Sequence, residues 1–195
     1  MDYQRWLLFC SQLPATPSSP RVMIWRRLRA SGATGLQNGV WVLPHSVEHE
    51  KLAEELQTYV EQQGGTSQVL TAASFNSSTE ARILDLFRAD REQEYLEFKE
   101  QCQDFLGEID KEVRRENFSY AEYEENEENF NKLVDWLAKI QRRDFTGGAE
   151  AAEAPKLLES CRQALQVFAD VVYGHEGGTP DHNPPRNTDS RPDGA

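Results

Sequence analysis

The stretch that decides the fold is RVMIWRRLRASGATGLQNGVWVLP, from Arg21 to Pro44. Its first half predicts a helix with one buried face, because apolar residues recur there at helical spacing. These residues are Val22, Ile24, Trp25 and Leu28. Its second half predicts a β-hairpin, because Asn38-Gly39 separates two short apolar strands and both turn positions favour positive φ. The segment therefore indicates a helix followed directly by two antiparallel strands.

The sequence on either side of this stretch completes an α+β pattern. Before it, RWLLFCSQL (5–13) reads as a buried strand, and Pro20 suits the first turn of the helix. After it, Ser46 can cap a second helix, and TSQVLTAASF (66–75) reads as a last strand. The apolar face of that second helix is supplied by Leu52, Leu56, Tyr59 and Val60. This order predicts a ferredoxin-like βαββαβ domain, with both helices on one face of a four-stranded antiparallel sheet.

From about Glu80 the pattern changes to three amphipathic helices. Each repeats its apolar residues in steps of three and four, the spacing of a heptad seam. The first seam comprises Tyr95, Phe98, Cys102, Phe105 and Ile109, and is continued less regularly upstream by Leu84, Phe87 and Arg91. The second comprises Tyr123, Phe130, Leu133, Leu137 and Ile140, and the third Leu158, Cys161, Leu165, Phe168 and Val172. Short connections between them predict an antiparallel bundle or long hairpin.

These patterns divide the chain into three regions. We expect a ferredoxin-like domain over residues 1–76, a helical bundle or hairpin over 77–173, and a disordered polar tail over 174–195. The four tryptophans, Trp6, Trp25, Trp41 and Trp136, are expected to fill the cores of the two folded regions. The same is expected of Cys10, Cys102 and Cys161, which form no CxxC motif or disulfide framework.

Composition favours a cytoplasmic protein. The chain has 195 residues, of which 38% are hydrophobic and 28% charged, and its formal net charge is −12. No apolar run reaches the roughly 18 residues needed to cross a bilayer, and the N-terminal apolar stretch is too short for a secretory signal.

Positive charge is concentrated near the N-terminus of this acidic chain. Residues 1–45 carry five arginines against the single acid Asp2. Four of them, Arg21, Arg26, Arg27 and Arg29, fall within the first predicted helix and are the candidate DNA-binding or oxyanion-binding residues. Guanidinium groups suit this role because they present forked donors to phosphate and similar oxyanions. The alternative is a solvated helix back whose arginines pair with the acidic bundle, for example with the cluster Glu124, Glu125, Glu127 and Glu128.

Other constellations do not indicate catalysis. His45-Ser46-Val47-Glu48-His49 matches H-x-x-E-H, but His45 precedes the predicted helix cap and would not share a helical face with His49. The glutamate cluster lacks a neighbouring histidine, and neither a glycine-rich phosphate loop nor a G-x-S-x-G motif is visible. We therefore expect no enzyme activity, no metal site and no cofactor.

Three stretches together resemble the N-terminal region of the ChrB family of bacterial chromate-resistance regulators. They are RWLLFCSQLP, RVMIWRRLRASGATGLQNGVWVLP and FSYAEYEENEENFNKLVDWLAKIQRRDF, and the resemblance covers roughly residues 4–173. It implies a chromate-responsive protein that binds DNA near resistance genes and releases it when the oxyanion is present. It also implies a binding role for Arg21, Arg26, Arg27 and Arg29, which lie where this family tends to be basic.

The resemblance has one departure. Proteins of the ChrB family usually carry a further C-terminal domain associated with the chromate response, whereas this chain continues into a polar tail. We therefore expect either a homodimer or a separate sensor-domain partner. A protein–protein interaction module without nucleic-acid binding remains an alternative.

A looser similarity concerns the first part of the chain, which is similar to PaaX-type repressors and the CRISPR-associated Cas2 nucleases. The resemblance to Cas2-like nucleases gives the weaker hypothesis, because nuclease activity in that family is associated with an aspartate just after the first strand. The corresponding residues here are Cys10-Ser11-Gln12-Leu13, which include no acid.

Overall fold

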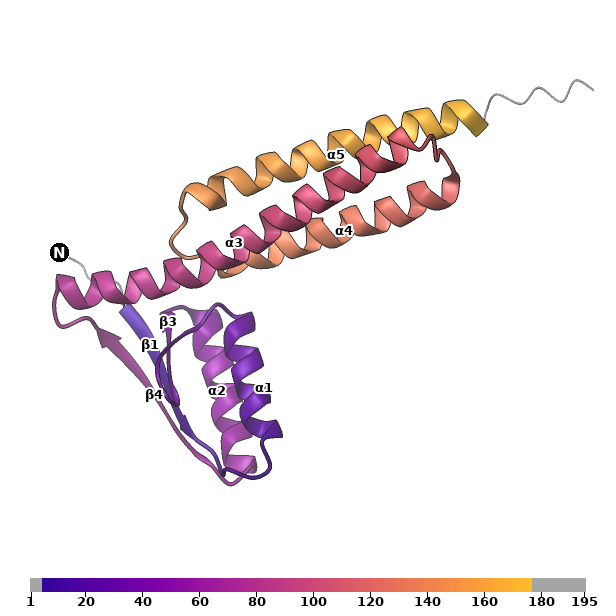
Figure 1. Cartoon of the computed structure of the whole chain (residues 1–195). Helices are drawn as coiled ribbons and strands as arrows, with labels where there is room; N and C mark the ends of the chain where they lie inside the picture. Colours follow the sequence, from indigo (N-terminus) through magenta and orange to yellow (C-terminus); the bar gives the residue numbers. More distant parts are fainter. Residues whose placement is uncertain (1–4, 177–195) are drawn as a thin grey trace, which may run out of the picture.

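The computed structural model describes residues 5–176, and its N-terminal half is an α+β layer (Figure 1). Four strands form one antiparallel sheet in the order β2-β3-β1-β4. Their bounds are Arg5–Gln12 for β1, Thr34–Gln37 for β2, Val40–Pro44 for β3 and Thr66–Ala73 for β4. Helices α1 (Ser19–Ala30) and α2 (Val47–Gln62) lie side by side on one face of the sheet. The predicted succession of four strands and two helices is confirmed.

Helix α1 buries a narrower face than its sequence suggests. Its buried residues are Pro20, Ile24 and Leu28, which recur every four positions and pack towards the sheet. Trp25 is 51% exposed and Val22 is 41% exposed, so the prediction that they fill the core is wrong. Because each residue turns the helix by about 100°, both lie well around the helix from the buried row. Trp6 is buried as expected, and Trp41 and Trp136 are half-buried.

The β2–β3 hairpin forms across Asn38-Gly39, as predicted. Gly39 has a φ of +75°, but Asn38 is not in the positive-φ region, so the expected geometry is wrong at that position. The pairing of β2 with β3 shifts register between Gly35 and Gln37. Such a bulge changes the local twist, which allows the two strands to be joined without left-handed backbone at both turn positions.

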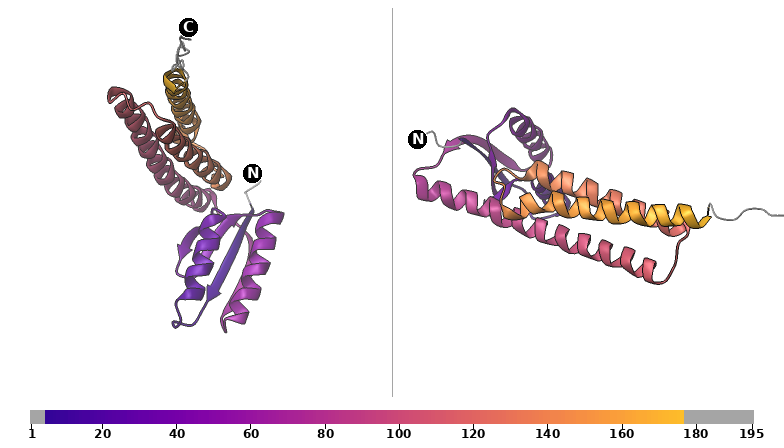
Figure 2. Two further views of the ribbon diagram at one scale, coloured as in Figure 1. Left: turned by 90° about the vertical axis from the view of Figure 1, so that its right-hand side faces the viewer. Right: turned by 90° about the horizontal axis from the view of Figure 1, so that it is seen from above.

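Three long helices form the second half of the described chain (Figure 2). They are α3 (Ser77–Arg114), α4 (Tyr120–Arg143) and α5 (Ala149–Glu176), and they run alongside one another away from the sheet. Their shared core includes Phe98, Cys102, Leu137, Cys161 and Phe168, which are at most 4% exposed. The predicted seams therefore face one another. Residues 177–195, most of the predicted disordered tail, lie outside the described residues.

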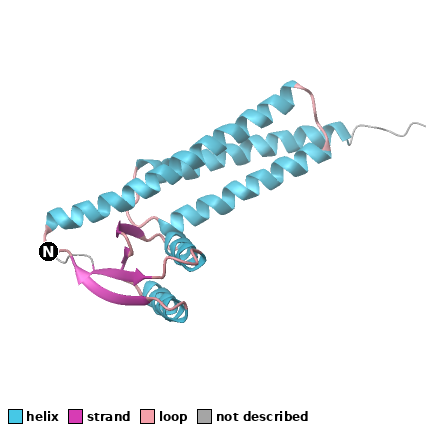
Figure 3. Ribbon diagram, turned by 60° about the horizontal axis from the view of Figure 1, so that its bottom comes forward, coloured by secondary structure: helices cyan, strands magenta, loops and turns pink. Residues whose placement is uncertain are grey.

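Helix α3 belongs to both halves of the molecule (Figure 3). Its first turns pack on the sheet face opposite α1 and α2, where Trp6 stacks on Phe87 with ring centroids 5.6 Å apart. The indole Nε1 of Trp6 also donates a hydrogen bond to Glu80 Oε2 at 2.9 Å. One long helix thus ties the sheet to the bundle.

Within residues 5–176, no helix combines the length and the apolar composition that crossing a bilayer requires.

Candidate anion-binding surface and its junction with the bundle

The four candidate arginines of α1 have different environments. Arg26 is exposed and makes no hydrogen bond or ion pair within the described part of the chain. Arg21 is also exposed, and its Nη1 donates to the backbone carbonyl of Pro14 at 2.7 Å, which leaves its charge uncompensated. Together with Val22 and Trp25, these two residues form what we call the outer surface of α1. It combines two cations with a half-exposed indole.

The other two arginines pair with acids of neighbouring helices. Arg27 forms an ion pair with Glu55 of α2, and both side chains are more than one-third exposed. Arg29 Nη1 lies 2.6 Å from Asp90 Oδ2 of α3, with both side chains about 70% buried. The first pair is a surface contact of small energetic value, whereas the second fastens the end of α1 to the bundle helix.

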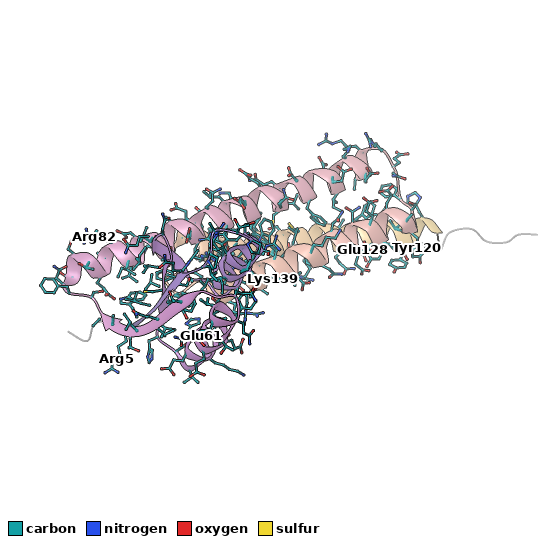
Figure 4. The ribbon with its side chains drawn as sticks, turned by 90° about the horizontal axis from the view of Figure 1, so that it is seen from below. Arg5, Glu61, Arg82, Tyr120, Glu128 and Lys139 are labelled. Atoms are coloured by element: carbon teal, nitrogen blue, oxygen red, sulfur yellow. The ribbon has the colours of Figure 1, made fainter. Side chains whose placement is uncertain are left out.

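The acidic cluster on α4 is not the partner of α1. Glu128 lies on the bundle away from the α/β layer (Figure 4). The alternative predicted from sequence, in which the basic helix pairs with Glu124, Glu125, Glu127 and Glu128, is therefore not what the structure shows. The acids that meet α1 are Glu55 and Asp90.

Polar and charged side chains link α1 and β2 to α3, and α3 to α4. Asp90 accepts hydrogen bonds from Arg29 and from the buried hydroxyl of Thr34, the latter at 2.9 Å. One turn further along α3, Glu94 Oε2 accepts from Arg91 Nη1 at 3.0 Å and from Arg143 Nη2 at 2.8 Å. We call these five charged residues, Arg29, Asp90, Arg91, Glu94 and Arg143, the junction network. It contains three arginines and two carboxylates.

The buried member of this network is incompletely satisfied. Arg91 is only 2% exposed, and its Nε and Nη2 groups have no hydrogen-bond partner among the described residues. Burial lowers the pKa of Arg91 from its usual range, and the neighbouring Arg143 and Arg29 lower it further, while Glu94 opposes the shift. The junction therefore carries buried positive charge that its own carboxylates do not fully balance.

An aromatic contact closes the junction. Phe145, in the connection between α4 and α5, meets His49 edge-on at 5.5 Å and Phe87 edge-on at 5.8 Å. Gly32 follows α1 with a φ of +86°, and a Cβ there would lie 2.9 Å from the carbonyl oxygen of Arg143. The turn after α1 can approach the bundle this closely only because residue 32 has no side chain.

The two histidines of the H-x-x-E-H match do not converge. His45 lies before α2 with its Nε2 2.7 Å from Glu50 Oε1, whereas His49 Nδ1 donates to the carbonyl of Pro44 at 2.7 Å. Across residues 5–176, no three His, Cys, Asp or Glu side chains are placed to share a metal ion.

The three cysteines are all free in the structure. Cys102 and Cys161 are buried as predicted, and the Cys161 thiol donates to the Cys102 carbonyl at 3.6 Å. Cys10 is half-buried rather than buried. It follows Phe9 in β1 and therefore lies on the sheet face opposite α1 and α2.

Comparison with known proteins relates the chain to the ChrB family. A family model described as "Protein ChrB, N-terminal" matches residues 21–179, which is most of the chain. Protein ChrB of Cupriavidus metallidurans is 32% identical over 93 residues, covering 48% of this chain. That match spans 28% of the relative's own length.

Proposed function

Because the chain belongs to the ChrB N-terminal family, we propose that it is a regulatory protein of chromate resistance that binds DNA through the outer surface of α1. The observation that carries this proposal is the position of Arg26, exposed and without an acidic partner in the described chain, in a protein of net charge −12. The guanidinium of Arg26, which follows the exposed Trp25 on α1, is therefore available for an external anion.

The chemistry of the outer surface suits nucleic acid. Arginine provides forked donors for phosphate oxygens, and the half-exposed indole of Trp25 offers a flat apolar face to sugar or base. Helix α1 has 12 residues and is therefore about 18 Å long, which allows it to follow several phosphates. Because the rest of the chain is acidic, binding should depend on a few local contacts and weaken steeply with salt.

The ferredoxin-like assignment of the α/β layer is part of the same proposal. It is supported by the antiparallel strand order β2-β3-β1-β4 and by two helices on one sheet face. In this arrangement the helix layer is free to meet a partner on its outer side, because α3 packs on the opposite face of the sheet.

Fluorescence anisotropy of a labelled duplex from upstream of the protein's own operon tests DNA binding. Titrations at two salt concentrations compare wild type with Arg26→Ala, Trp25→Ala and the control Arg162→Ala, which removes an exposed arginine on α5. Arg26→Ala should weaken binding, because one phosphate contact is lost. It should also reduce the salt slope, the steepness with which log K falls against log salt concentration, by about 1. Equal binding by Arg26→Ala and Arg162→Ala would remove the outer surface from the proposal.

Chromate added to the same titrations tests the regulatory part. Release of DNA by chromate, with no effect of sulfate at equal ionic strength, supports a self-sufficient regulator. Binding that is indifferent to chromate supports a module that works with a separate sensor-domain partner. Size-exclusion chromatography with light scattering then determines whether the protein that binds DNA is a homodimer.

A second candidate function is a protein–protein interaction module without nucleic-acid binding. It is favoured by the ion pairs of Arg27 and Arg29, which engage half of the candidate arginines inside the chain. Under this alternative, wild type shows no retention of duplex even at low salt.

A further inference from the structure

A pocket of about 410 Å³ lies where three helix ends meet. It is formed by the C-terminal end of α1, the N-terminal end of α2 and the C-terminal end of α4. The polar residues that line it and matter here are Arg27, Ser31, Ser46, His49, Arg142 and Arg143. The pocket therefore joins the basic helix to the basic end of the bundle, which lie far apart in the sequence.

The lining of this pocket contains more arginines than acids. Arg27, Arg142 and Arg143 share it with one carboxylate, Glu48, while Arg27 also pairs with Glu55 and Arg143 with Glu94, two acids outside the lining. Arg142 is exposed and has no ion-pair partner within residues 5–176. Its guanidinium donors are therefore available, and guanidinium groups are well suited to bind a tetrahedral oxyanion in a concave site.

The N-terminal end of α2 adds positive electrostatic potential to this pocket. Ser46 caps this helix by accepting a hydrogen bond from the backbone N–H of His49 at 3.1 Å, so the first turn lies at the pocket wall. The first N–H groups of a helix carry a partial positive charge and stabilise a nearby anion. This contribution is secondary to that of the three arginines, which come from two other helices.

A smaller pocket of about 200 Å³ beside the buried Arg91 does not share this character. Its two arginines, Arg88 and Arg91, are matched by Glu92 and Glu150 in the lining. Charge balance therefore favours the larger pocket as the site where an anion would be held.

We propose that the pocket between α1, α2 and α4 binds a tetrahedral oxyanion through Arg27, Arg142 and Arg143. The oxyanion is either a free inorganic ion or the phosphate group of a nucleotide or nucleic acid, which present the same chemistry to guanidinium groups. This site is distinct from the outer surface of α1, and it does not depend on DNA binding there. Because Arg143 also belongs to the junction network, an occupied pocket would add a counter-charge next to the buried arginines.

Nuclear magnetic resonance titration of the full chain with sodium sulfate, and separately with inorganic phosphate, tests the site. Ionic strength is held constant with sodium chloride. Saturable shifts are expected at the amides of residues 46–49 and 142–146. Arg142→Glu should weaken sulfate binding by about tenfold or more, because it replaces an unpaired donor with a repelling charge. Arg162→Glu, the matched control on α5, should leave it unchanged.

The remaining arms separate the two sources of oxyanion. Saturation by sulfate and phosphate assigns a free ion, whereas saturation only by adenosine monophosphate or a short duplex assigns a nucleic-acid phosphate. If no probe gives saturable shifts, or if Arg142→Glu binds as wild type does, the proposal is overturned. Arg26→Ala should weaken DNA binding but keep sulfate binding, so failure of the DNA proposal and failure of this one are distinguishable.

Discussion

Replacing Glu94 by glutamine should destabilise the protein strongly, although the change is nearly isosteric. Glu94 accepts hydrogen bonds from both Arg91 and Arg143, and its side chain is only 19% exposed. Hydrogen bonds to charged groups contribute about 1.5–3 kcal/mol each, and breaking a buried ion pair costs about 3–5 kcal/mol because one charge is left uncompensated. Partial solvent access at Glu94 and Arg143 favours the lower end. We expect a loss of about 3 kcal/mol in the free energy of unfolding.

Urea unfolding at pH 7, followed by circular dichroism and tryptophan fluorescence, measures this loss. Glu97→Gln is the matched control, because Glu97 is exposed on the same helix three residues later. The control should change stability by less than about 0.5 kcal/mol. A loss below about 1 kcal/mol for Glu94→Gln would refute the reasoning, since it would mean that the buried charge of Arg91 does not need Glu94.

The double variant Arg91→Met, Glu94→Gln sharpens the test. A buried ion pair can often be exchanged for apolar packing at little cost, whereas removal of one partner alone is costly. Methionine should fill the space of the arginine stem without its charge. The double variant is therefore expected to be more stable than Glu94→Gln alone. If it is instead less stable, the cost of Glu94→Gln does not come from stranding Arg91.

Three further perturbations probe the same fold. Phe87→Ala should cost about 3–5 kcal/mol in urea unfolding, because it removes a buried ring that stacks on the sheet, whereas Phe75→Ala, at a ring that is 92% exposed, should be near neutral. Gly32→Ala should cost about 1–3 kcal/mol, since its Cβ would press against the α4–α5 connection at positive φ, and an unchanged melting midpoint would contradict that contact. The hydrogen bond to Glu127, with burial, raises the pKa of Tyr123 to about 12. Because the folded pKa exceeds the unfolded value of about 10, this contribution to stability is complete below pH 10 and is lost between about pH 10 and 12. Carbon-13 detection of the tyrosine rings should show one pKa falling in Glu127→Gln.

The sequence patterns predicted burial best in the helical bundle, where each helix packs against the other two. The heptad steps of the bundle identified buried positions such as Phe98, Leu137 and Phe168, because a helix packed between two others must repeat its apolar residues every three or four positions. The same logic failed for Trp25. There the sheet covers only a narrow row of α1, and spacing alone cannot show how wide the covered face is.

The junction network was missed because it depends on contacts between distant segments. Arg91 continues the seam of α3 at a position where an apolar residue would be expected, and this was the one available signal of a buried charge. Its partner Glu94 also accepts a hydrogen bond from Arg143, 49 residues further along the chain, and this contact follows from how α3 and α4 pack. Local periodicity cannot predict such a pairing.

The arginines of the basic helix α1 thus have different roles, and these roles determine which variants can test DNA binding. Arg29 fastens α1 to α3, Arg27 holds α2 and lines the proposed oxyanion pocket, and Arg26 has no acid to hold within the described chain. Replacing all three together would remove two ion pairs and one exposed cation at once. A loss of DNA retention could then result from a loosened junction as readily as from a missing phosphate contact. Single substitutions separate these roles, because stability should fall with Arg29→Ala and the salt slope with Arg26→Ala.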